Sequence, residues 1–356
     1  ALGLATGRNT SFAELATGLT LPGWEGALLQ GYGGLSTVLA AALLLTLALG
    51  QVAQPFERSR AAATLGVAGL GVAACGAGNL LTLTLWWGTI DLYTPLLLRH
   101  TAPLQAERRS GRMVFIGMAS TLALLAAAWT MQVEAGHTRL EAGDALSAAL
   151  PWLTAAAVLR LAPWPVHANY ASTEGSLLSR YAGAALWLRL TPMLGPTWLP
   201  GLAPVALATL WAACVLMAVS PRLSGPYLGL VGASLMVLAP LCHPLAGGGV
   251  ALLVLVNQSW AGALLALEPG LRALLPRRWW FVPLALALGA LAGMPLTAGL
   301  VTHWAAVSWV GRLGSGAVVL TGAALTLLAS ALWRHGLLAQ PPAADARRHW
   351  TVVSYW

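Results

Sequence analysis

The stretch RLAPWPVHANY, residues 160–170, closes a long run of mostly apolar residues and combines an arginine, two prolines and a histidine. Each of these residues is unfavourable inside hydrocarbon, because Arg is charged, His is polar and Pro removes a backbone donor. A spanning helix can be interrupted in this way only where its freed backbone groups face protein or a water-filled cavity. The stretch therefore predicts a membrane helix that is broken at Pro163 and Pro165.

The composition indicates a polytopic membrane protein. Of the 356 residues, 58% are hydrophobic and 8% are charged, whereas about a quarter of the residues are charged in soluble proteins. All 19 basic residues are Arg, and the formal net charge is +8. A basic excess on so apolar a chain is typical of a cytoplasmic membrane face rather than of a nucleic-acid site. We expect the lipid bilayer, and no nucleic acid, as a partner.

Spanning helices need about 20 apolar residues, and this rule predicts eleven spans. Their ranges are 34–54, 61–77, 79–98, 113–133, 144–162, 177–195, 203–220, 225–242, 246–267, 279–309 and 314–335. The tenth span is too long for one straight helix and contains GMPLTAG, so we expect a break at Pro295. The fold class predicted is an all-α polytopic membrane protein with two broken helices.

The arginines give the orientation, because cytoplasmic loops carry an excess of basic residues. With eleven alternating spans, one side receives Arg58, Arg60, Arg99, Arg108, Arg109, Arg112, Arg222, Arg272, Arg277, Arg278, Arg334, Arg347 and Arg348, and the other receives Arg8, Arg139 and Arg312. This asymmetry predicts an extracytoplasmic N-terminus and a cytoplasmic C-terminus. We expect three parts: an extracytoplasmic segment 1–33, a transmembrane domain 34–335 and a cytoplasmic tail 336–356.

The start of the chain, ALGLATGRNTSF, lacks a basic start and an apolar core, so no signal peptide is expected there. Cys75, Cys214 and Cys242 lie within or at the edges of apolar segments without C-x-x-C spacing. This placement predicts small core residues rather than disulfides or metal ligands. The motifs H-E-x-x-H, G-x-S-x-G and the P-loop are absent from the sequence, so an unrelated membrane enzyme has no support.

Several polar residues fall inside the predicted spans and form the candidate site. They are Asp91, Arg160, Arg180, Arg189 and His303, with His167 just beyond the first break. Charged residues at this depth usually pair with one another or face a cavity. Asp91 is expected to be protonated or paired with an Arg. Arg180 and Arg189 lie toward the ends of their span, so their side chains could instead reach the membrane interface.

The same residues resemble a known family. RLAPWPVHANY is similar to the broken-helix motif of the antiporter-like subunits of respiratory complex I, membrane-bound hydrogenases and multisubunit cation/proton antiporters. In that family a Lys stands five residues before the Pro of a Pro-aromatic-His motif. Arg160 stands at that distance from Pro165, and His167 follows.

Two later stretches extend the resemblance. SRYAGAALWLRL, residues 179–190, resembles the next helix of the family, where a Lys stands nine residues before an Arg; here these positions are Arg180 and Arg189. AGMPLTAGLVTHW, residues 292–304, resembles the second broken helix of the family, with His303 at the position of a Lys.

The resemblance covers about residues 60 to 335. RMVFIGMAS, residues 112–120, resembles the helix before the first broken one, and Asp91 falls within about one residue of the family's paired Glu. The resemblance implies an antiporter-like inverted-repeat bundle whose two broken helices lie near 160–167 and 293–299.

The resemblance also implies a role. The chain would be a membrane subunit of a complex I-like or antiporter-like assembly in the cell inner membrane, taking part in proton or cation translocation beside other membrane and peripheral subunits. It would be at most a non-catalytic subunit of a NADH:quinone oxidoreductase-like or hydrogenase-like complex. No cofactor is implied, because electron transfer in such assemblies takes place in other subunits.

One departure from the family bears on this role. The family's Lys residues relay protons by alternating between charged and neutral forms, whereas keeping an Arg neutral at pH 7 costs roughly 8 kcal/mol. Of the polar residues, His303, Asp91 and His167 could still carry a proton. Three alternatives remain: a transport subunit that uses these residues, a degenerate non-conducting structural subunit, and a membrane partner of an inorganic-carbon uptake complex. No particular residue supports the third alternative.

Overall fold

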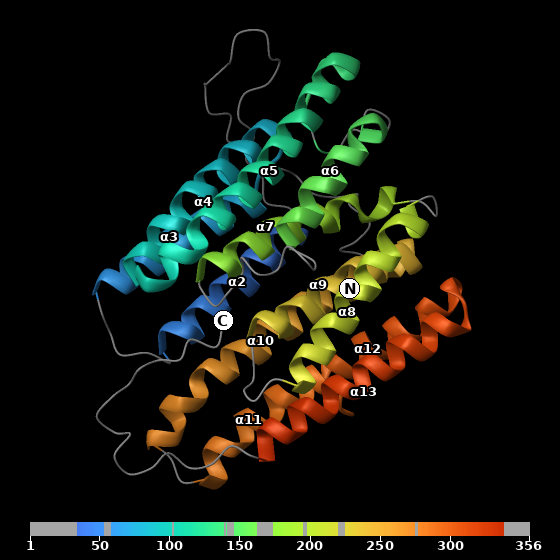
Figure 1. The fold of residues 1–356 in the computed structure, drawn as a ribbon. Helices are drawn as coiled ribbons and strands as arrows, with labels where there is room; N and C mark the ends of the chain where they lie inside the picture. Colours follow the sequence, from blue (N-terminus) through green and yellow to red (C-terminus); the bar gives the residue numbers. More distant parts are fainter. Residues whose placement is uncertain are drawn as a thin grey trace. The chain divides into compact units, whose positions relative to one another are not determined.

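The computed structural model describes residues 34–52, 58–101, 103–138, 140, 146–161, 174–194, 198–219, 225–274 and 277–337. This part of the chain folds into twelve α-helices, labelled α2 to α13 in Figure 1. All eleven predicted spans fall on helices, and the tenth falls on two. The predicted all-α fold is confirmed.

Four segments of the described helices are long and apolar enough to span a membrane. They are Val114–Ala135, Gly201–Val219, Ala246–Leu265 and Ser315–Arg334. Large apolar side chains also face outward from the helices; Phe115, for example, is 74% exposed. An apolar outer surface is typical of helices that lie in lipid. The chain is a multi-pass membrane protein, while the total of eleven crossings and their orientation stay predictions.

The chain divides into two compact units. Unit 1 contains the start of α2 (Gly34–Val52) and five further helices: α3 (Arg58–Cys75), α4 (Leu80–Thr101), α5 (Pro103–Ala135), α6 (Leu146–Leu161) and α7 (Glu174–Leu190). Unit 2 contains α8 (Leu199–Val219), α9 (Gly225–Cys242), α10 (Pro244–Leu274), α11 (Arg277–Ala292), α12 (Ala298–Val310) and α13 (Ser315–Leu337). Helices α3 to α7 are blue to yellow-green and α8 to α13 are yellow to red in Figure 1, while the end of α2, from Leu45, is grouped with unit 2.

The two units share one pattern of helix pairing. In unit 1, α3 packs on α4 and α7, α5 packs on α4 and α6, and α6 packs on α7. In unit 2, α8 packs on α9 and α13, α10 packs on α9 and α11, and α11 packs on α13. Each of these five pairings in the first unit therefore has a counterpart in the second, as expected of an internal repeat. A sixth pairing, α4 on α7, has its nearest equivalent in α9 on α12 rather than on α13. The inverted relation between the repeats stays a prediction.

The predicted break in the tenth span is confirmed. Helix α11 ends at Ala292 and α12 begins at Ala298. Between them, Gly293 and Leu296 have φ angles of 73° and 68°, values that an α-helix cannot contain. Pro295 has no N–H to continue the helix. At the first break, α6 ends at Leu161, and residues 162–173 lie outside the described part of the chain.

The three cysteines are core residues, as predicted. Cys75, Cys214 and Cys242 are all buried and none forms a disulfide.

Close helix packing in this molecule depends on small residues, which is common in membranes. A β-carbon at Gly71, for example, would collide with the side chain of Leu43.

Candidate functional site

Two helices of unit 1 contribute an arginine and an aspartate that form a buried ion pair. Arg160 stands in the last turn of α6, and Asp91 belongs to α4. The Arg160 Nη1 atom lies 2.7 Å from Asp91 Oδ1, and Nη2 donates to Oδ2 at 2.9 Å. The side chains are 1% and 6% exposed. The two carboxylate oxygens therefore contact the two terminal nitrogens of the guanidinium. This bidentate geometry is the strongest for an Arg–carboxylate pair.

Neighbouring polar groups complete the surroundings of the pair. The Thr121 hydroxyl on α5 donates to Asp91 Oδ2 at 2.7 Å and accepts from Arg160 Nη2 at 3.0 Å. The Ser179 hydroxyl on α7 accepts from Nη1 at 3.4 Å. Trp87 accepts from Nη2 through its backbone carbonyl at 3.2 Å, and its ring lies 4.4 Å from Arg160 Cζ in a cation–π contact. Helices α4 to α7 thus all contact one ion pair.

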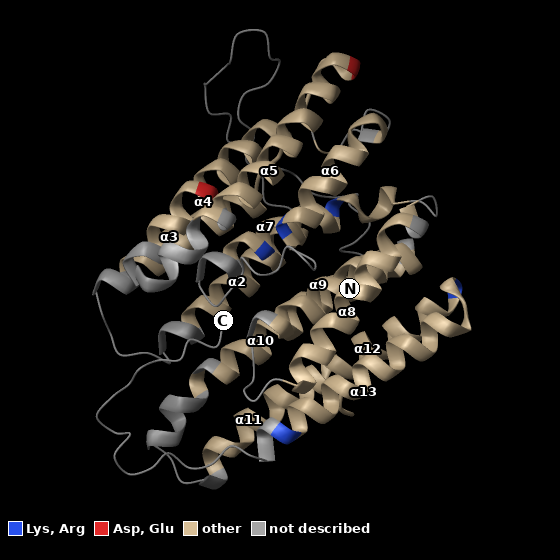
Figure 2. Ribbon diagram, in the orientation of Figure 1, with Lys and Arg blue, Asp and Glu red and all other residues tan. Residues whose placement is uncertain are grey.

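Two glycines allow the helices to approach the pair closely. A β-carbon at Gly117 of α5 would collide with the Asp91 carboxylate, and one at Gly183 of α7 would stand 2.6 Å from the Arg160 Cβ. Real β-carbons do not approach other atoms so closely, so a larger residue at either position would force the neighbouring groups to shift. In Figure 2 the ribbon of α4 to α7 is coloured red at described acidic residues and blue at described arginines.

This arrangement is suited to holding charge in place. Arg stays protonated in proteins, and the pair carries no net charge. Removing one partner from a buried pair leaves an uncompensated charge, which is strongly destabilising. Among the described residues, no group of three or more His, Cys, Asp or Glu is placed to hold a metal ion.

Arg189 lies apart from the ion pair and contacts the end of α3. Its Nη1 donates to the Ala77 carbonyl at 2.5 Å and its Nη2 to the Cys75 carbonyl at 2.7 Å. In unit 2, Arg312 donates to the Cys242 carbonyl at the end of α9 at 2.7 Å. Carbonyls at helix C-termini lack intrahelical partners and attract cations. Both arginines thus donate hydrogen bonds to backbone carbonyls at or just beyond the C-terminal end of a helix.

The remaining sequence-predicted residues divide into two groups. Arg180 follows Ser179 on α7 and is partly buried. Pro163, Pro165 and His167 lie outside the described residues.

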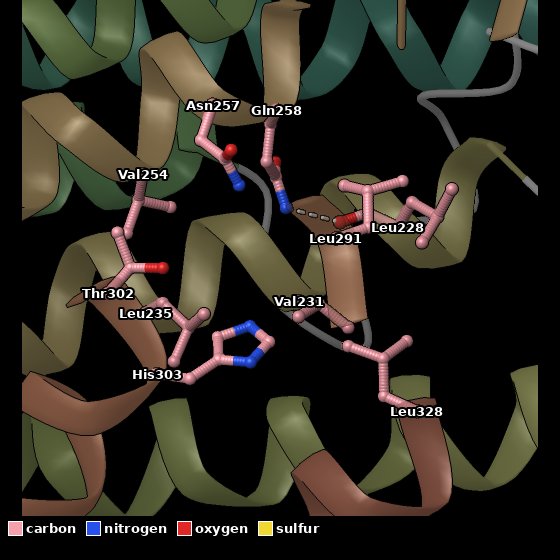
Figure 3. Close-up of a pocket in the computed structure, with 10 residues that line it drawn as sticks. All are labelled: Leu228, Val231, Leu235, Val254, Asn257, Gln258, Leu291, Thr302, His303 and Leu328. Atoms are coloured by element: carbon pink, nitrogen blue, oxygen red, sulfur yellow. Dashed lines mark hydrogen bonds between the residues drawn. The ribbon is translucent and has the colours of Figure 1, made fainter. Parts of the chain in front are cut away.

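His303 stands in a small cavity of unit 2, lined by apolar and polar side chains and drawn in Figure 3. The cavity is about 10 Å³, at the lower limit for one water molecule. Its polar lining comes from Asn257, Gln258, Thr302 and His303. Gln258 Nε2 donates to the Leu228 carbonyl at 2.9 Å.

The break in the tenth span lies close to His303. Asn257 Nδ2 donates to the Ala290 carbonyl at 3.1 Å, near the end of α11. A β-carbon at Gly293 would collide with the His303 ring, and one at Gly299 would collide with the Ala290 carbonyl. The two acids whose side chains are described, Asp91 and Glu134, both belong to unit 1. The described part of unit 2 therefore offers His303 no acidic partner.

Sequence reasoning missed the residues that surround both sites. In unit 1 these are Trp87, Gly117, Thr121, Ser179 and Gly183; in unit 2 they are Asn257 and Gln258. The unit 1 residues carried a usable signal, because residues four apart share one helix face. Trp87 precedes Asp91 by four residues, Gly117 precedes Thr121 by four, and Ser179 precedes Gly183 by four. Each polar group of the site therefore has a packing residue one turn away.

The fold and the site define an all-α, multi-pass membrane protein built from two similarly paired helical units, one of which holds a buried ion pair. No family model and no curated protein matches the sequence. Solved structures do match.

One match is a chain in the structure of the Mrp complex from Dietzia sp. DQ12-45-1b, with a TM-score of 0.71 and 18% identity over 94% of this chain. The present chain spans 42% of that one. Two matches are chains of respiratory complex I from Thermus thermophilus. With aureothin bound, the TM-score is 0.70 at 20% identity, covering 88% of this chain and 79% of that one. With NADH bound, the TM-score is 0.77 at 17% identity, covering 94% of this chain and 80% of that one.

The chain therefore has the fold of membrane subunits found in the Mrp complex and in respiratory complex I. The resemblance drawn from the broken-helix motifs is confirmed at the level of the fold.

Proposed function

We propose that the chain is a membrane subunit of a complex I-like or antiporter-like multisubunit assembly, in which unit 1 holds a fixed ion pair and does not conduct protons. The observation that supports this most directly is the two-ended contact between Arg160 and Asp91. The fold shared with chains of such assemblies supports the wider assignment. For unit 1, this proposal adopts the alternative of a structural subunit that does not conduct protons.

The physical reason lies in what a proton relay requires. A relay group must gain and lose a proton at small cost in free energy. Arg160 remains protonated, and protonation of Asp91 would leave Arg160 as a lone buried cation, which costs several kcal/mol. Thr121, Ser179 and Trp87 all accept hydrogen bonds from the guanidinium, so they hold it in one position against Asp91.

The position in the cell follows from the sequence and belongs to the same proposal. We place the chain in the cell inner membrane, with segment 1–33 outside and the tail 336–356 in the cytoplasm. The uneven distribution of Arg between predicted loops supports this orientation.

Replacing both members of the pair by apolar residues tests whether unit 1 conducts. In the Arg160→Met/Asp91→Leu double variant, a static pair is exchanged for apolar groups of similar size, which is often neutral or stabilising. With the whole assembly in liposomes and a potassium diffusion potential as the driving force, the rate of proton uptake should equal that of the wild type. The rate is followed by quenching of a pH-sensitive dye, with equal amounts of assembly incorporated. Loss of proton uptake in a correctly assembled double variant would show that the pair conducts.

A second candidate function is proton passage through unit 2. The cavity that places His303 beside Asn257, Gln258 and Thr302 favours it, because these groups can orient a water molecule next to a titratable imidazole. The His303→Gln variant keeps a hydrogen-bonding side chain and removes the titration. If unit 2 conducts, the same assay should show proton uptake reduced by about tenfold or more, within the range of single proton-transfer groups. An unchanged rate would exclude His303 as a proton carrier.

A further inference from the structure

The break between α11 and α12 leaves backbone polar groups without partners. Met294 N donates to the Gly289 carbonyl at 2.9 Å, and Thr297 donates to the Met294 carbonyl through both its N–H and its hydroxyl. Within the described part of unit 2, neither the N–H of Leu296 nor the carbonyls of Pro295 and Leu296 have a hydrogen bond. These groups must be satisfied by something outside the described helices.

The break also lies deep in the spanning region. Helix α11 has 16 residues and α12 has 13, which correspond to about 24 Å and 20 Å of helix. Both halves pack on α13, which has 23 residues. A hydrocarbon core is about 30 Å thick, so a break between two halves of similar length falls near its middle. Water from either surface does not reach the outer side of a helix at that depth.

The outer face of the break is apolar and uncovered. Leu296 is fully exposed, with a relative exposure of 104%, and Met294 and Pro295 are exposed beside it. The exposed stripe continues along α12 through Leu300 and Trp304, the latter 72% exposed. We call these five residues the break face. An apolar face alone would suit lipid, but lipid offers no hydrogen bonds to the Leu296 backbone.

We propose that the break face binds a membrane-spanning helix of a partner subunit. The occupant must be apolar to cover Leu296, Leu300 and Trp304, and it must carry a Ser, Thr, Asn or Gln that hydrogen-bonds the Leu296 backbone. Small and polar residues of this kind are those that join helices in membranes. Irregular backbone at this depth is tolerated where protein buries it. The inference rests on the proposed function, since it assigns to one surface a partner that the assembly provides.

Photocrosslinking in the intact assembly tests the proposal. p-Benzoylphenylalanine replaces Leu296 in one variant and Leu286 in another; Leu286 is the matched control, 56% exposed on the unbroken part of α11. The expected product at position 296 is an adduct with a subunit that co-purifies in stoichiometric amount, and the linked peptide maps to an apolar segment of that subunit. The control should give lipid adducts. Adducts at position 296 with lipid alone, or with other residues of the same chain, would overturn the proposal.

A substitution gives a second readout that does not depend on crosslinking. Leu296→Trp adds bulk to a side chain that is fully exposed in the described part of the chain, so the chain itself should fold. In the assembly the Trp meets the partner helix, and we expect the affinity to fall by about tenfold, as measured by loss of the partner on dilution. Leu286→Trp should have no effect. Equal partner retention in both variants would contradict the inference, whereas absence of any stoichiometric partner would contradict the proposed function itself.

Discussion

Replacing Asp91 by leucine while Arg160 is kept is expected to lower the free energy of unfolding by about 3–5 kcal/mol. The variant leaves a guanidinium that is 1% exposed without its counter-charge, and Arg cannot become neutral to reduce the cost. Arg160→Met leaves the Asp91 carboxylate buried without its counter-charge, so this variant should also lose stability. Unfolding by increasing mole fractions of a denaturing detergent in mixed micelles measures both values.

The double variant Arg160→Met/Asp91→Leu completes the cycle. Its stability should lie within about 1 kcal/mol of the wild type or above it, since a buried pair can be replaced by apolar groups without loss. The two single costs would then be strongly non-additive, as expected for residues in contact. If the double variant instead lost the sum of the two single costs, Arg160 and Asp91 would not be coupled.

The second large effect concerns Gly183. A methyl group in Gly183→Ala would stand 2.6 Å from the Arg160 Cβ and 3.3 Å from the Ala157 carbonyl. Neither atom belongs to the flexible end of a side chain, so α6 and α7 must separate, at a cost of about 1–3 kcal/mol. Separation would also lengthen the Ser179 contact with Arg160. Detergent unfolding again provides the measurement.

Gly69 on α3 is the matched control for this substitution. A β-carbon there meets nothing within 4 Å, so Gly69→Ala should stabilise the helix by up to about 1 kcal/mol. Equal stability of the Gly183→Ala and Gly69→Ala variants would show that α6 and α7 do not pack as closely as described.

The sequence predicted the helices and the second break because their causes are local. Apolar length determines where a helix crosses a membrane, and the Gly, Pro and Thr of GMPLTAG end α11 and begin α12 within a few residues. The expectation that Asp91 would be either protonated or paired with an arginine also had a general cause, since an isolated charge at that depth is too costly.

The sequence alone could not show which of the three arginines pairs with Asp91. Arg160, Arg180 and Arg189 all fall in predicted spans, and each could have reached an acid or an interface. The carbonyls that Arg189 contacts are 112 and 114 residues away along the chain. No local pattern indicates that the carbonyls of Cys75 and Ala77, at and just beyond the end of α3, will meet α7. Only the packing of α3 on α7 brings them together.

The neutrality of the buried pair affects how unit 1 responds to an energised membrane. Moving a lone elementary charge through the membrane potential changes its energy by about 2.3 kcal/mol per 100 mV. Arg160 and Asp91 carry opposite charges on atoms 2.7 Å apart, so the potential exerts almost no net force on them together. The potential pulls α4 and α6 in opposite directions, and the direct contact between the two charges resists their separation.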